Sequence, residues 1–338
     1  MAKSATEPAR RAGRVLITRS LGLGDLCTAI PALRAVRRAF PRHEITLAAP
    51  AWQTPIALRA GVDRVVDTVG LAPLGDEFRG VDVAVNLHRP GPESIRRLLP
   101  LQPARLISYR HPRIAATSGG PDWDSREHEV ERWCRLLTHA GIAVDPHDRR
   151  LGVSGHDPVH GTRGRWNGVA LHPGAAAPGR RWPQERFAAV ARYLFHAGQR
   201  VVVTGSAEES DLCAAVVALA NDSRGAWNRA SLVATPPPIS IAGKTGLDGL
   251  MGILRGARAL IVNDTGVAHL AAALGTPSVV LFGPTSPEPW GPPKGARHRV
   301  LWKGRLRDPH AQPVDAGLEG ISVTEVLRTL DDLIGLTV

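Results

Sequence analysis

The first half of the chain alternates short apolar, β-branched runs with stretches of helical spacing. The run RVLITR at 14–19 leads through a glycine-bearing turn at 21–25 into a helical pattern that continues to Phe40. Pro41 ends this pattern, and the run EITLAA at 44–49 predicts the next strand. Strand, turn, helix and strand in this order predict a βαβ unit and hence a parallel sheet. The same half predicts further strands at 64–67, 81–86 and 105–108, and a helix at 126–140.

The alternation stops at 154–167, where the sequence SGHDPVHGTRGRWN combines glycine, histidine, proline and charge without apolar periodicity. Such a composition predicts a linker. A second series of apolar runs and helical patterns follows it. Strands are predicted at 168–171, 199–204, 239–242, 259–262 and 278–282, and helices at 183–197, 208–220, 247–255, 267–274 and 324–333.

Two such series predict an α/β protein with two Rossmann-like domains, each built on a parallel sheet. We expect a flexible leader at 1–13, an N-terminal domain at 14–153, a linker at 154–167, a C-terminal domain at 168–321 and a C-terminal helix at 322–338. Ligands of open parallel sheets bind beyond the carboxyl ends of the strands. With two domains facing each other, we expect that location to be the cleft between them.

Composition narrows the classes of function. With 338 residues, 43% of them hydrophobic, the chain is long enough for two cores, and it has no apolar run as long as a membrane span. The three cysteines, Cys27, Cys134 and Cys213, lie far apart, which supports neither a disulfide framework nor a zinc site. We therefore expect a cytoplasmic protein with at most peripheral membrane contact.

The charge of the chain fits an anionic partner. The formal net charge is +11 and is carried mainly by arginine. Aromatic residues make up only 4% of the chain, and no basic run is interleaved with the aromatics that stack on single-stranded bases. We therefore expect no nucleic-acid partner.

The stretch at 263–293, NDTGVAHLAAALGTPSVVLFGPTSPEPWGPP, carries the most specific chemistry. Thr265 and Gly266 are predicted to open a helix, whose free N–H groups and positive dipole end suit a diphosphate. His269, one turn further along, can reach the same anion. The alternative is structural: Asp264 or Thr265 caps the helix, and His269 lies in the core.

This stretch resembles the heptosyltransferase family, glycosyltransferase family 9, in which N-D-[ST]-G-x-x-H-L-A-A-A-L-G-x-P is followed by L-F-G-x-T and W-G. Two earlier blocks agree with the family in the same order. LHPGAAAPGRRWPQERF at 171–187 resembles its N-P-G-A…[KR]-R-W-P-x-E-R-F block, and VLITRSLGLGDLCTAIPAL at 15–33 resembles its I-x-R-x-x-x-x-G-D-x-x-x-x-x-P-A-L block. The resemblance implies the GT-B fold of two Rossmann-like domains.

The resemblance implies an inverting transfer in one displacement, with Asp25 as the general base that takes the proton of the acceptor hydroxyl. On local grounds alone, Asp25 is equally well interpreted as the N-cap of a helix that begins at Leu26. The resemblance also implies that Arg180 or Arg181 holds the donor phosphates and stabilises the leaving diphosphate. The alternative is a solvated arginine shortly before Pro183.

Further donor contacts follow from the resemblance. Those with the donor sugar and its phosphates are implied for Asp264, Thr265, Gly266 and His269. Glu208 or Glu209 is implied to bind the ribose, because a carboxylate accepts two hydroxyl hydrogen bonds in dinucleotide folds. Lys244 lies at the expected rim of the adenine pocket. Two positions depart from the family pattern: alanines at 175–177 replace the hydroxyl residues of some members, and His172 stands where asparagine is common.

The implied donor is an ADP-sugar, with a heptose or a hexose, and neither a metal nor a further cofactor is needed. Asp122-Trp123-Asp124 matches a D-x-D metal motif only superficially, because it lies in a Gly/Pro-rich loop of the domain opposite the donor. The acceptor is either a glycan such as the lipopolysaccharide core or an aminoglycoside-like natural product. An anionic acceptor is predicted to bind Arg89, Arg96 and Arg97; the alternative is a solvated, arginine-rich surface.

Two other functions stay open. A sugar-nucleotide epimerase can share the fold, but it needs carboxylate and histidine groups around the sugar for elimination. A non-catalytic nucleotide-sugar-binding protein has no need of a carboxylate at Asp25, whereas a transferase requires one there.

Overall fold

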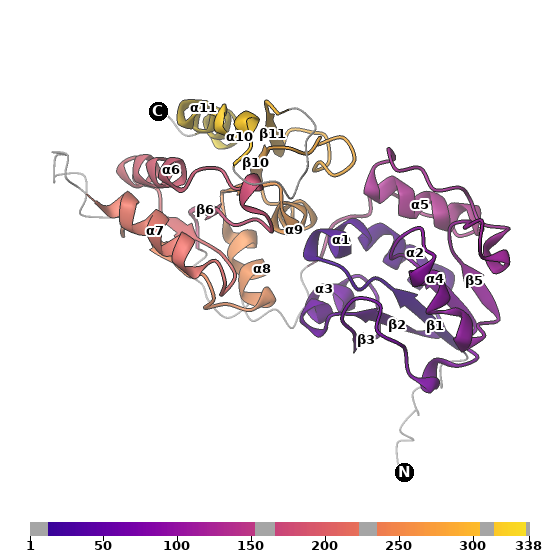
Figure 1. Cartoon of the computed structure of the whole chain (residues 1–338). Helices are drawn as coiled ribbons and strands as arrows, with labels where there is room; N and C mark the ends of the chain where they lie inside the picture. The colour runs from indigo at the N-terminus through magenta and orange to yellow at the C-terminus, as the bar shows by residue number, and fades with distance from the viewer. Residues whose placement is uncertain (1–12, 153–165, 223–234, 305–313, 336–338) are drawn as a thin grey trace, which may run out of the picture. The chain divides into compact units, whose positions relative to one another are not determined.

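The computed structural model describes residues 13–152, 166–222, 235–304 and 314–335 (Figure 1). By its internal contacts the chain divides into two compact units, 1–148 and 149–338, and each unit is described by itself. The predicted leader at 1–13 and linker at 154–167 lie almost wholly outside the described residues. Within these described ranges, no helix is long and apolar enough to cross a membrane.

The first unit is built on a five-stranded sheet in the order β3-β2-β1-β4-β5. Its strands are β1 (Gly13–Thr18), β2 (His43–Ala49), β3 (Arg64–Asp67), β4 (Val83–Asn86) and β5 (Arg105–Ile107). Every pairing is parallel, so the carboxyl ends of the strands share one edge of the sheet. The helices are α1 (Leu23–Thr28), α2 (Ile30–Ala39), α3 (Thr54–Arg59), α4 (Glu93–Arg96) and α5 (Glu129–His139).

Both faces of this sheet are covered by apolar side chains. On one face, Leu16 of β1 and Ala84 of β4 pack with Phe78 in one cluster. On the other face, Ile17 of β1 is equally buried. A strand covered on both faces needs apolar residues at successive positions, which explains the continuous apolar run of β1.

The helical pattern predicted to run to Phe40 consists of two helices. Helix α1 ends at Thr28, and α2 begins at Ile30 with Pro31 in its first turn. Proline has no N–H group to donate, so it is tolerated in a first turn and prevents the preceding helix from continuing. Helices α3 and α4 escape prediction because elements of six and four residues are too short to show a helical period.

The second unit is built on a six-stranded sheet in the order β11-β10-β9-β6-β7-β8, and its pairings are again parallel. Its strands are β6 (Val169–His172), β7 (Val201–Val203), β8 (Ile239–Ser240), β9 (Ala259–Asn263), β10 (Ser278–Phe282) and β11 (His298–Trp302). Its helices are α6 (Gln184–His196), α7 (Ser210–Asn221), α8 (Leu247–Gly256), α9 (Gly266–Leu274), α10 (Ala316–Glu319) and α11 (Val323–Ile334). The sequence pattern does not predict β11, a half-exposed edge strand.

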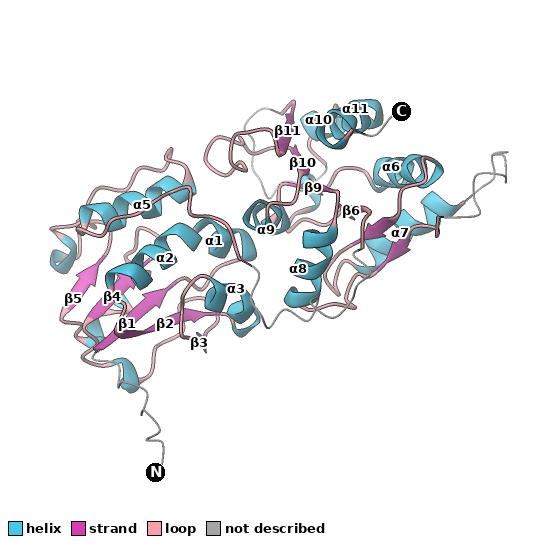
Figure 2. Ribbon diagram, turned by 180° about the vertical axis from the view of Figure 1, so that it is seen from behind, coloured by secondary structure: helices cyan, strands magenta, loops and turns pink. Residues whose placement is uncertain are grey.

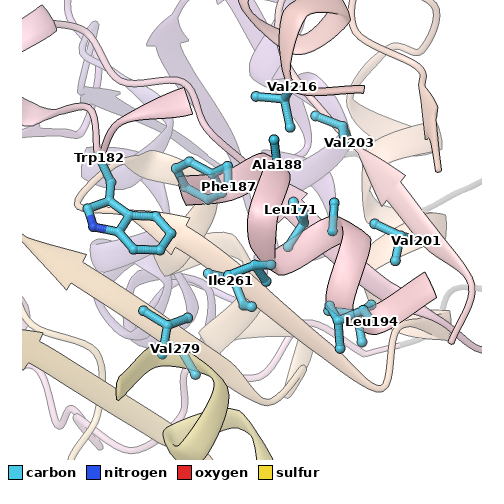
Figure 3. Close-up of a cluster of buried hydrophobic side chains, with 14 of the residues drawn as sticks. Leu171, Trp182, Phe187, Ala188, Leu194, Val201, Val203, Val216, Ile261 and Val279 are labelled. Carbon is cyan, nitrogen blue, oxygen red and sulfur yellow. The ribbon is translucent and has the colours of Figure 1, made fainter. Parts of the chain in front are cut away.

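The core of the second unit lies between its sheet and helices α6, α7 and α11, around Trp182 and Phe187 (Figure 3). These two rings meet edge to face, 5.1 Å between centroids. The Trp182 indole N–H also donates to the backbone oxygen of Ile321 at 3.0 Å. Helix α9 contacts β9 and β10 and packs on α8 (Figure 2). The core thus anchors the turn before α6 close to the carboxyl ends of the strands.

Candidate active site

In the first unit, Asp25 lies in the first turn of α1, just beyond the carboxyl end of β1. The N-cap of α1 is Gly22, and its backbone N–H donates to Asp25 Oδ2 at 3.2 Å. The alternative of Asp25 as N-cap of a helix from Leu26 is therefore wrong, because the helix begins three residues earlier. The Asp25 side chain is 23% exposed, so its carboxylate is open to a substrate on one side.

Arg19 lies behind this turn and is the residue there that sequence reasoning left without a role. It is completely buried, and its Nε donates to the backbone oxygen of Asp25 at 2.5 Å. Its Nη2 lies 3.8 Å from Asp25 Oδ1 and 3.0 Å from Glu129 Oε1 of α5. A buried ion pair therefore supports the turn that carries Asp25.

The three arginines predicted to bind an acceptor differ in their surroundings. Arg89 and Arg96 are exposed, whereas Arg97 is 9% exposed. Arg97 donates to Thr68 Oγ1 at 2.7 Å and to the Gly70 oxygen at 3.3 Å. Burial lowers its pKa from the usual value. Arg97 is therefore held inside the unit, and Arg89 and Arg96 are the two that present their charge to solvent.

His88 joins this region and carried no signal in the sequence. It follows β4 and is 6% exposed. Neither of its ring nitrogens forms a hydrogen bond of normal geometry with a described residue. Burial, and then the charges of Arg89 and Arg19, lower its pKa to about 4. At neutral pH the first unit therefore offers an uncharged imidazole among arginines at the carboxyl edge of its sheet.

The Asp122-Trp123-Asp124 segment has structural partners. Asp122 accepts from Arg110 at 2.7 Å, and Asp124 accepts from the backbone N–H of Arg126 at 2.9 Å. The Trp123 ring lies under the guanidinium of Arg132, 4.3 Å from the ring centroid. This agrees with the structural interpretation of the motif. Among the residues described, no cluster of three or more His, Cys, Asp or Glu side chains is arranged to hold a metal ion.

In the second unit, Asp264 follows β9 and does not cap α9. Its Oδ2 accepts from Arg180 at 2.5 Å and from Thr285 Oγ1 at 2.8 Å, and the side chain is 8% exposed. Thr265 is the N-cap residue, with extended backbone, but its side chain makes no cap hydrogen bond to the described residues. The first turn of α9, which starts at Gly266, thus keeps N–H groups available for an anion.

Arg180 and Arg181 have different hydrogen-bond partners in the structure. Arg180 reaches both the backbone and side-chain oxygens of Asp264, and its Nε has no partner among the described residues. Arg181 turns back onto its own loop, where its Nε donates to the oxygen of Ala175 at 3.0 Å. Only Arg180 therefore joins the end of β9 beside the first turn of α9.

Asn263 holds this arrangement together and was not singled out by the sequence. It is fully buried at the end of β9. Its side-chain oxygen accepts from the backbone N–H of Trp182 at 3.1 Å, and its amide nitrogen donates to the oxygen of Pro173 at 2.8 Å. One amide thus joins the loops after β6, before α6 and after β9. In the same region, the rings of His269 and Trp290 meet edge to face at 6.1 Å.

The two candidate ribose acids also lie in different surroundings. Glu209, at the start of α7, accepts from the Ser206 N–H at 2.9 Å and lies 3.9 Å from His172 Nε2. A Cβ at Gly174 would be 2.0 Å from Glu209 Oε1, so the glycine lets this carboxylate lie against the loop after β6. Glu208 is exposed, and a hydrogen bond from the Ser206 hydroxyl lowers its pKa.

His172 and Lys244 complete the candidate donor residues. Burial lowers the pKa of His172, the nearby Glu209 opposes this, and His172 Nδ1 pairs with Thr204 Oγ1 at 2.9 Å. Lys244 is exposed, and its Nζ donates to the oxygen of Ser240 at 3.4 Å. Its loop reaches the start of α7, because the N–H of the preceding glycine donates to the oxygen of Gly205 at 3.1 Å.

Comparison with solved structures defines the class of fold. The structure of the ADP-heptose lipopolysaccharide heptosyltransferase II of Escherichia coli matches with a TM-score of 0.75 at 24% identity, over 95% of this chain and 98% of that one. A family 9 glycosyltransferase of Veillonella parvula matches with a TM-score of 0.75 at 20% identity, over 98% and 99%. The predicted GT-B fold, with two parallel-sheet α/β domains, is confirmed.

Sequence comparison gives the family. The model of glycosyltransferase family 9 (heptosyltransferase) matches residues 121–314, more than half of the chain. The chain belongs to this family, as its three blocks predicted. Lipopolysaccharide heptosyltransferase 2 of E. coli strain K12 is 35% identical over 134 residues, 39% of this chain and 35% of that protein. Lipopolysaccharide heptosyltransferase 1 of Pseudomonas aeruginosa is 28% identical over 318 residues, 81% and 79%. The match to the E. coli enzyme thus spans about a third of its length.

Proposed function

We propose that this chain is an inverting, metal-independent glycosyltransferase that transfers a heptose from an ADP-sugar to a hydroxyl of a glycan acceptor. The observation that carries the proposal is the meeting of Arg180 and Asp264 beside the uncapped first turn of α9. Family membership supports the same class of reaction. A further relative in fold, the E. coli heptosyltransferase WaaC, has been solved with ADP and with ADP-2-deoxy-2-fluoro heptose.

The donor diphosphate is proposed to bind at the first turn of α9. The backbone N–H groups of Gly266 and Val267 supply donors at the positive end of the helix dipole, whereas the N–H of Ala268 already donates to the Thr265 oxygen at 3.0 Å. The Arg180 guanidinium, oriented by Asp264 at 2.5 Å, adds positioned N–H donors that stabilise the charge gained by the departing ADP. His269 lies one helical turn further along, where it can add a hydrogen bond.

The ribose is proposed to bind Glu209 rather than Glu208. Glu209 lies against Gly174 at the carboxyl end of β6, which is where ligands of parallel sheets bind. Glu208 is exposed to solvent, where its carboxylate gains little from a neutral hydroxyl. Lys244, on the loop beside Gly205, is proposed to line the rim of the adenine site.

The transfer itself is proposed to use Asp25 as general base. The acceptor hydroxyl loses its proton to the Asp25 carboxylate as its oxygen bonds the anomeric carbon. The bond between that carbon and the diphosphate oxygen breaks, its electrons leave with ADP, and attack from the opposite side inverts the configuration. The backbone N–H of Gly22, 3.2 Å from Asp25 Oδ2, keeps the carboxylate in a fixed rotamer for this step.

The acceptor is proposed to be an anionic glycan of the lipopolysaccharide-core type. Exposed Arg89 and the desolvated Arg97 place positive charge near His88, and Arg96 presents a further exposed charge. Positive charge attracts phosphate or carboxylate groups. The named curated relatives are lipopolysaccharide heptosyltransferases. A cationic aminoglycoside meets repulsion there. Independence of metal and a cytoplasmic location stay predictions.

The proposal is tested by measuring ADP release from ADP-heptose with purified protein, with and without a lipopolysaccharide-core acceptor, and in EDTA. Acceptor-dependent release that survives EDTA is expected. Binding of the ADP-sugar without release of ADP, whichever acceptor is added, would identify a non-catalytic binding protein. Release of free ADP-sugar isomers would identify an epimerase. Tighter binding of UDP than of ADP in calorimetry would overturn the donor assignment.

A further inference from the structure

Arg19 joins three separate segments of the first unit behind Asp25. Its guanidinium donates to the backbone oxygen of Asp25 at 2.5 Å, to Thr28 Oγ1 at 3.1 Å and to the oxygen of Leu87. Thr28 in turn donates to the same Asp25 oxygen at 2.8 Å. Arg19 therefore fixes the first turn of α1 relative to the ends of β1 and β4.

The charge of Arg19 is balanced by a carboxylate more than a hundred residues away in the sequence. Glu129 is 4% exposed, and its Oε1 accepts from Arg19 at 3.0 Å and from the Trp133 indole at 2.8 Å. Its other oxygen accepts from Arg132. Burial alone raises the pKa of Glu129, but Arg19, Arg132 and these hydrogen bonds hold the pKa below its usual value. Glu129 is therefore ionised at neutral pH.

The carboxylates of Glu129 and Asp25 both lie near one guanidinium nitrogen of Arg19. Arg19 Nη2 lies 3.0 Å from Glu129 Oε1 and 3.8 Å from Asp25 Oδ1. A lone cation at this distance from a base stabilises its charged form and weakens it as a proton acceptor. Glu129 offsets part of the charge of Arg19, because it also pairs with Arg132, and the hydrogen bond from Arg19 Nε to the Asp25 backbone is kept.

We propose that Arg19 and Glu129 are positioning residues of the transfer reaction: Arg19 fixes the geometry of Asp25, and Glu129 offsets the charge of Arg19 so that Asp25 can accept the acceptor proton. This inference rests on the proposed function, in which Asp25 is the base. It adds that helix α5, through the pairing of Glu129 with Arg19, takes part in the charge environment of Asp25.

The other charged or titratable groups around Asp25 keep one charge state at neutral pH. Cys27, on the same helix, stays a neutral thiol because burial raises its pKa. His88, on the β4 side of Arg19, is uncharged at neutral pH because burial, Arg89 and Arg19 lower its pKa to about 4. Arg132 lies behind Glu129 and already pairs with it. Glu129 is thus the ionised carboxylate that pairs with Arg19 behind Asp25, and its removal leaves Arg19 without that partner.

The first test is the substitution Glu129→Gln, which keeps the shape and removes the charge. The acid limb of the pH profile of kcat/KM should move to lower pH by about 0.5–1 unit, because uncompensated Arg19 stabilises ionised Asp25. The plateau value should fall about threefold, as expected for a weaker base. The matched control is Glu127→Gln, which removes the same charge from a carboxylate that pairs with Arg135 at 2.8 Å. The control should leave the profile in place.

The second test is Arg19→Lys, which keeps the charge and loses the Nε donor to the Asp25 backbone. Turnover should fall about tenfold or more, with the KM for the ADP-sugar within twofold and the acid limb unmoved. If the Glu129→Gln variant unfolds below the assay temperature, the Arg19→Lys variant tests the positioning role by itself. Unchanged turnover in Arg19→Lys, or a Glu129→Gln profile that superimposes on the parent, overturns the inference. Retained activity in Asp25→Asn instead overturns the proposed base itself.

Discussion

The turn that carries Asp25 in the first unit differs in its surroundings from the first turn of α9 in the second. In the first unit, Asp25 rests on buried side chains that pair with one another: Arg19 is fully buried and pairs with Glu129, which also pairs with Arg132. In the second unit, Arg180 keeps one N–H unpaired among the described residues, and the first turn of α9 has no side-chain cap. The first turn of α9 therefore offers backbone N–H donors to a ligand, whereas the unpaired Nε of Arg180 is itself buried.

This difference matches what each site is proposed to bind. A general base must keep one geometry and one charge state, so internal partners serve it well. A diphosphate brings its own negative charge, and donors already satisfied by protein groups would have to give up partners to bind it. Substitutions should therefore act on turnover in the first unit and on the donor in the second.

The largest effect is expected for Asp25→Asn. This change keeps the shape of the side chain and removes its ability to take a proton, so kcat should fall roughly 10²–10⁴-fold. Donor affinity, measured by calorimetry with ADP, should change less than twofold. Near-normal turnover would show that a group other than Asp25 is the base.

The next largest effect is expected for Arg180→Gln. Loss of one preorganised charge at the leaving group costs roughly 10²–10³-fold in kcat/KM, and ADP binding should weaken as well. The matched control is Arg181→Gln, because Arg181 bonds its own loop at Ala175. The control should stay within threefold of the parent. Equal losses in both variants would mean that the loop as a whole, rather than Arg180, holds the phosphates.

A smaller effect on the donor is expected for Glu209→Gln. Hydrogen bonds to a charged group contribute about 1.5–3 kcal/mol, so the KM for the ADP-sugar should rise about tenfold or more with little change in kcat. Glu208→Gln, at the adjacent exposed position, is the control and should have no measurable effect. A reversal of the two results would assign the ribose to Glu208.

The sequence predicted the parts of the molecule that depend on periodicity and on motif order. Apolar runs and helical spacing predicted two parallel α/β units, because strands buried on both faces need continuous apolar residues, as in β1 and β9. The family blocks predicted Asp25 and the turn at Asp264. In the structure Asp264 directly follows β9, whereas Asp25 lies in the first turn of α1, seven residues after the end of β1.

The sequence did not indicate which of two adjacent candidate residues joins the site, nor which residues far apart in the chain contact each other. Arg180 and Arg181 are adjacent in a loop, where no period tells which side chain turns toward Asp264. Glu129 lies 110 residues from Arg19, and only the packing of α5 brings them together. His88 gave no signal because its low pKa comes from burial and neighbouring arginines, which are properties of the fold.

The smallest expected effect concerns the acceptor and the exposed charges of the first unit. In the double variant Arg89→Gln/Arg96→Gln, the KM for an anionic glycan should rise about threefold to tenfold, because exposed ion pairs contribute roughly 0.2–1 kcal/mol each. Its dependence on salt should flatten, since fewer charges remain to be screened. Arg97 is left intact because it is buried and bonds Thr68, so its loss would disturb the unit itself.

The control for this prediction removes the same charge elsewhere on the first unit. Arg79→Gln/Arg126→Gln changes two exposed arginines that pair with Asp76 and Asp124. ADP binding should be the same in both double variants, because the proposed donor residues belong to the other unit. If the Arg89/Arg96 variant keeps the acceptor KM and its salt dependence, the two arginines are solvated surface. If the KM falls instead, the acceptor is cationic, and an aminoglycoside-like molecule replaces the anionic glycan as the substrate of the first unit.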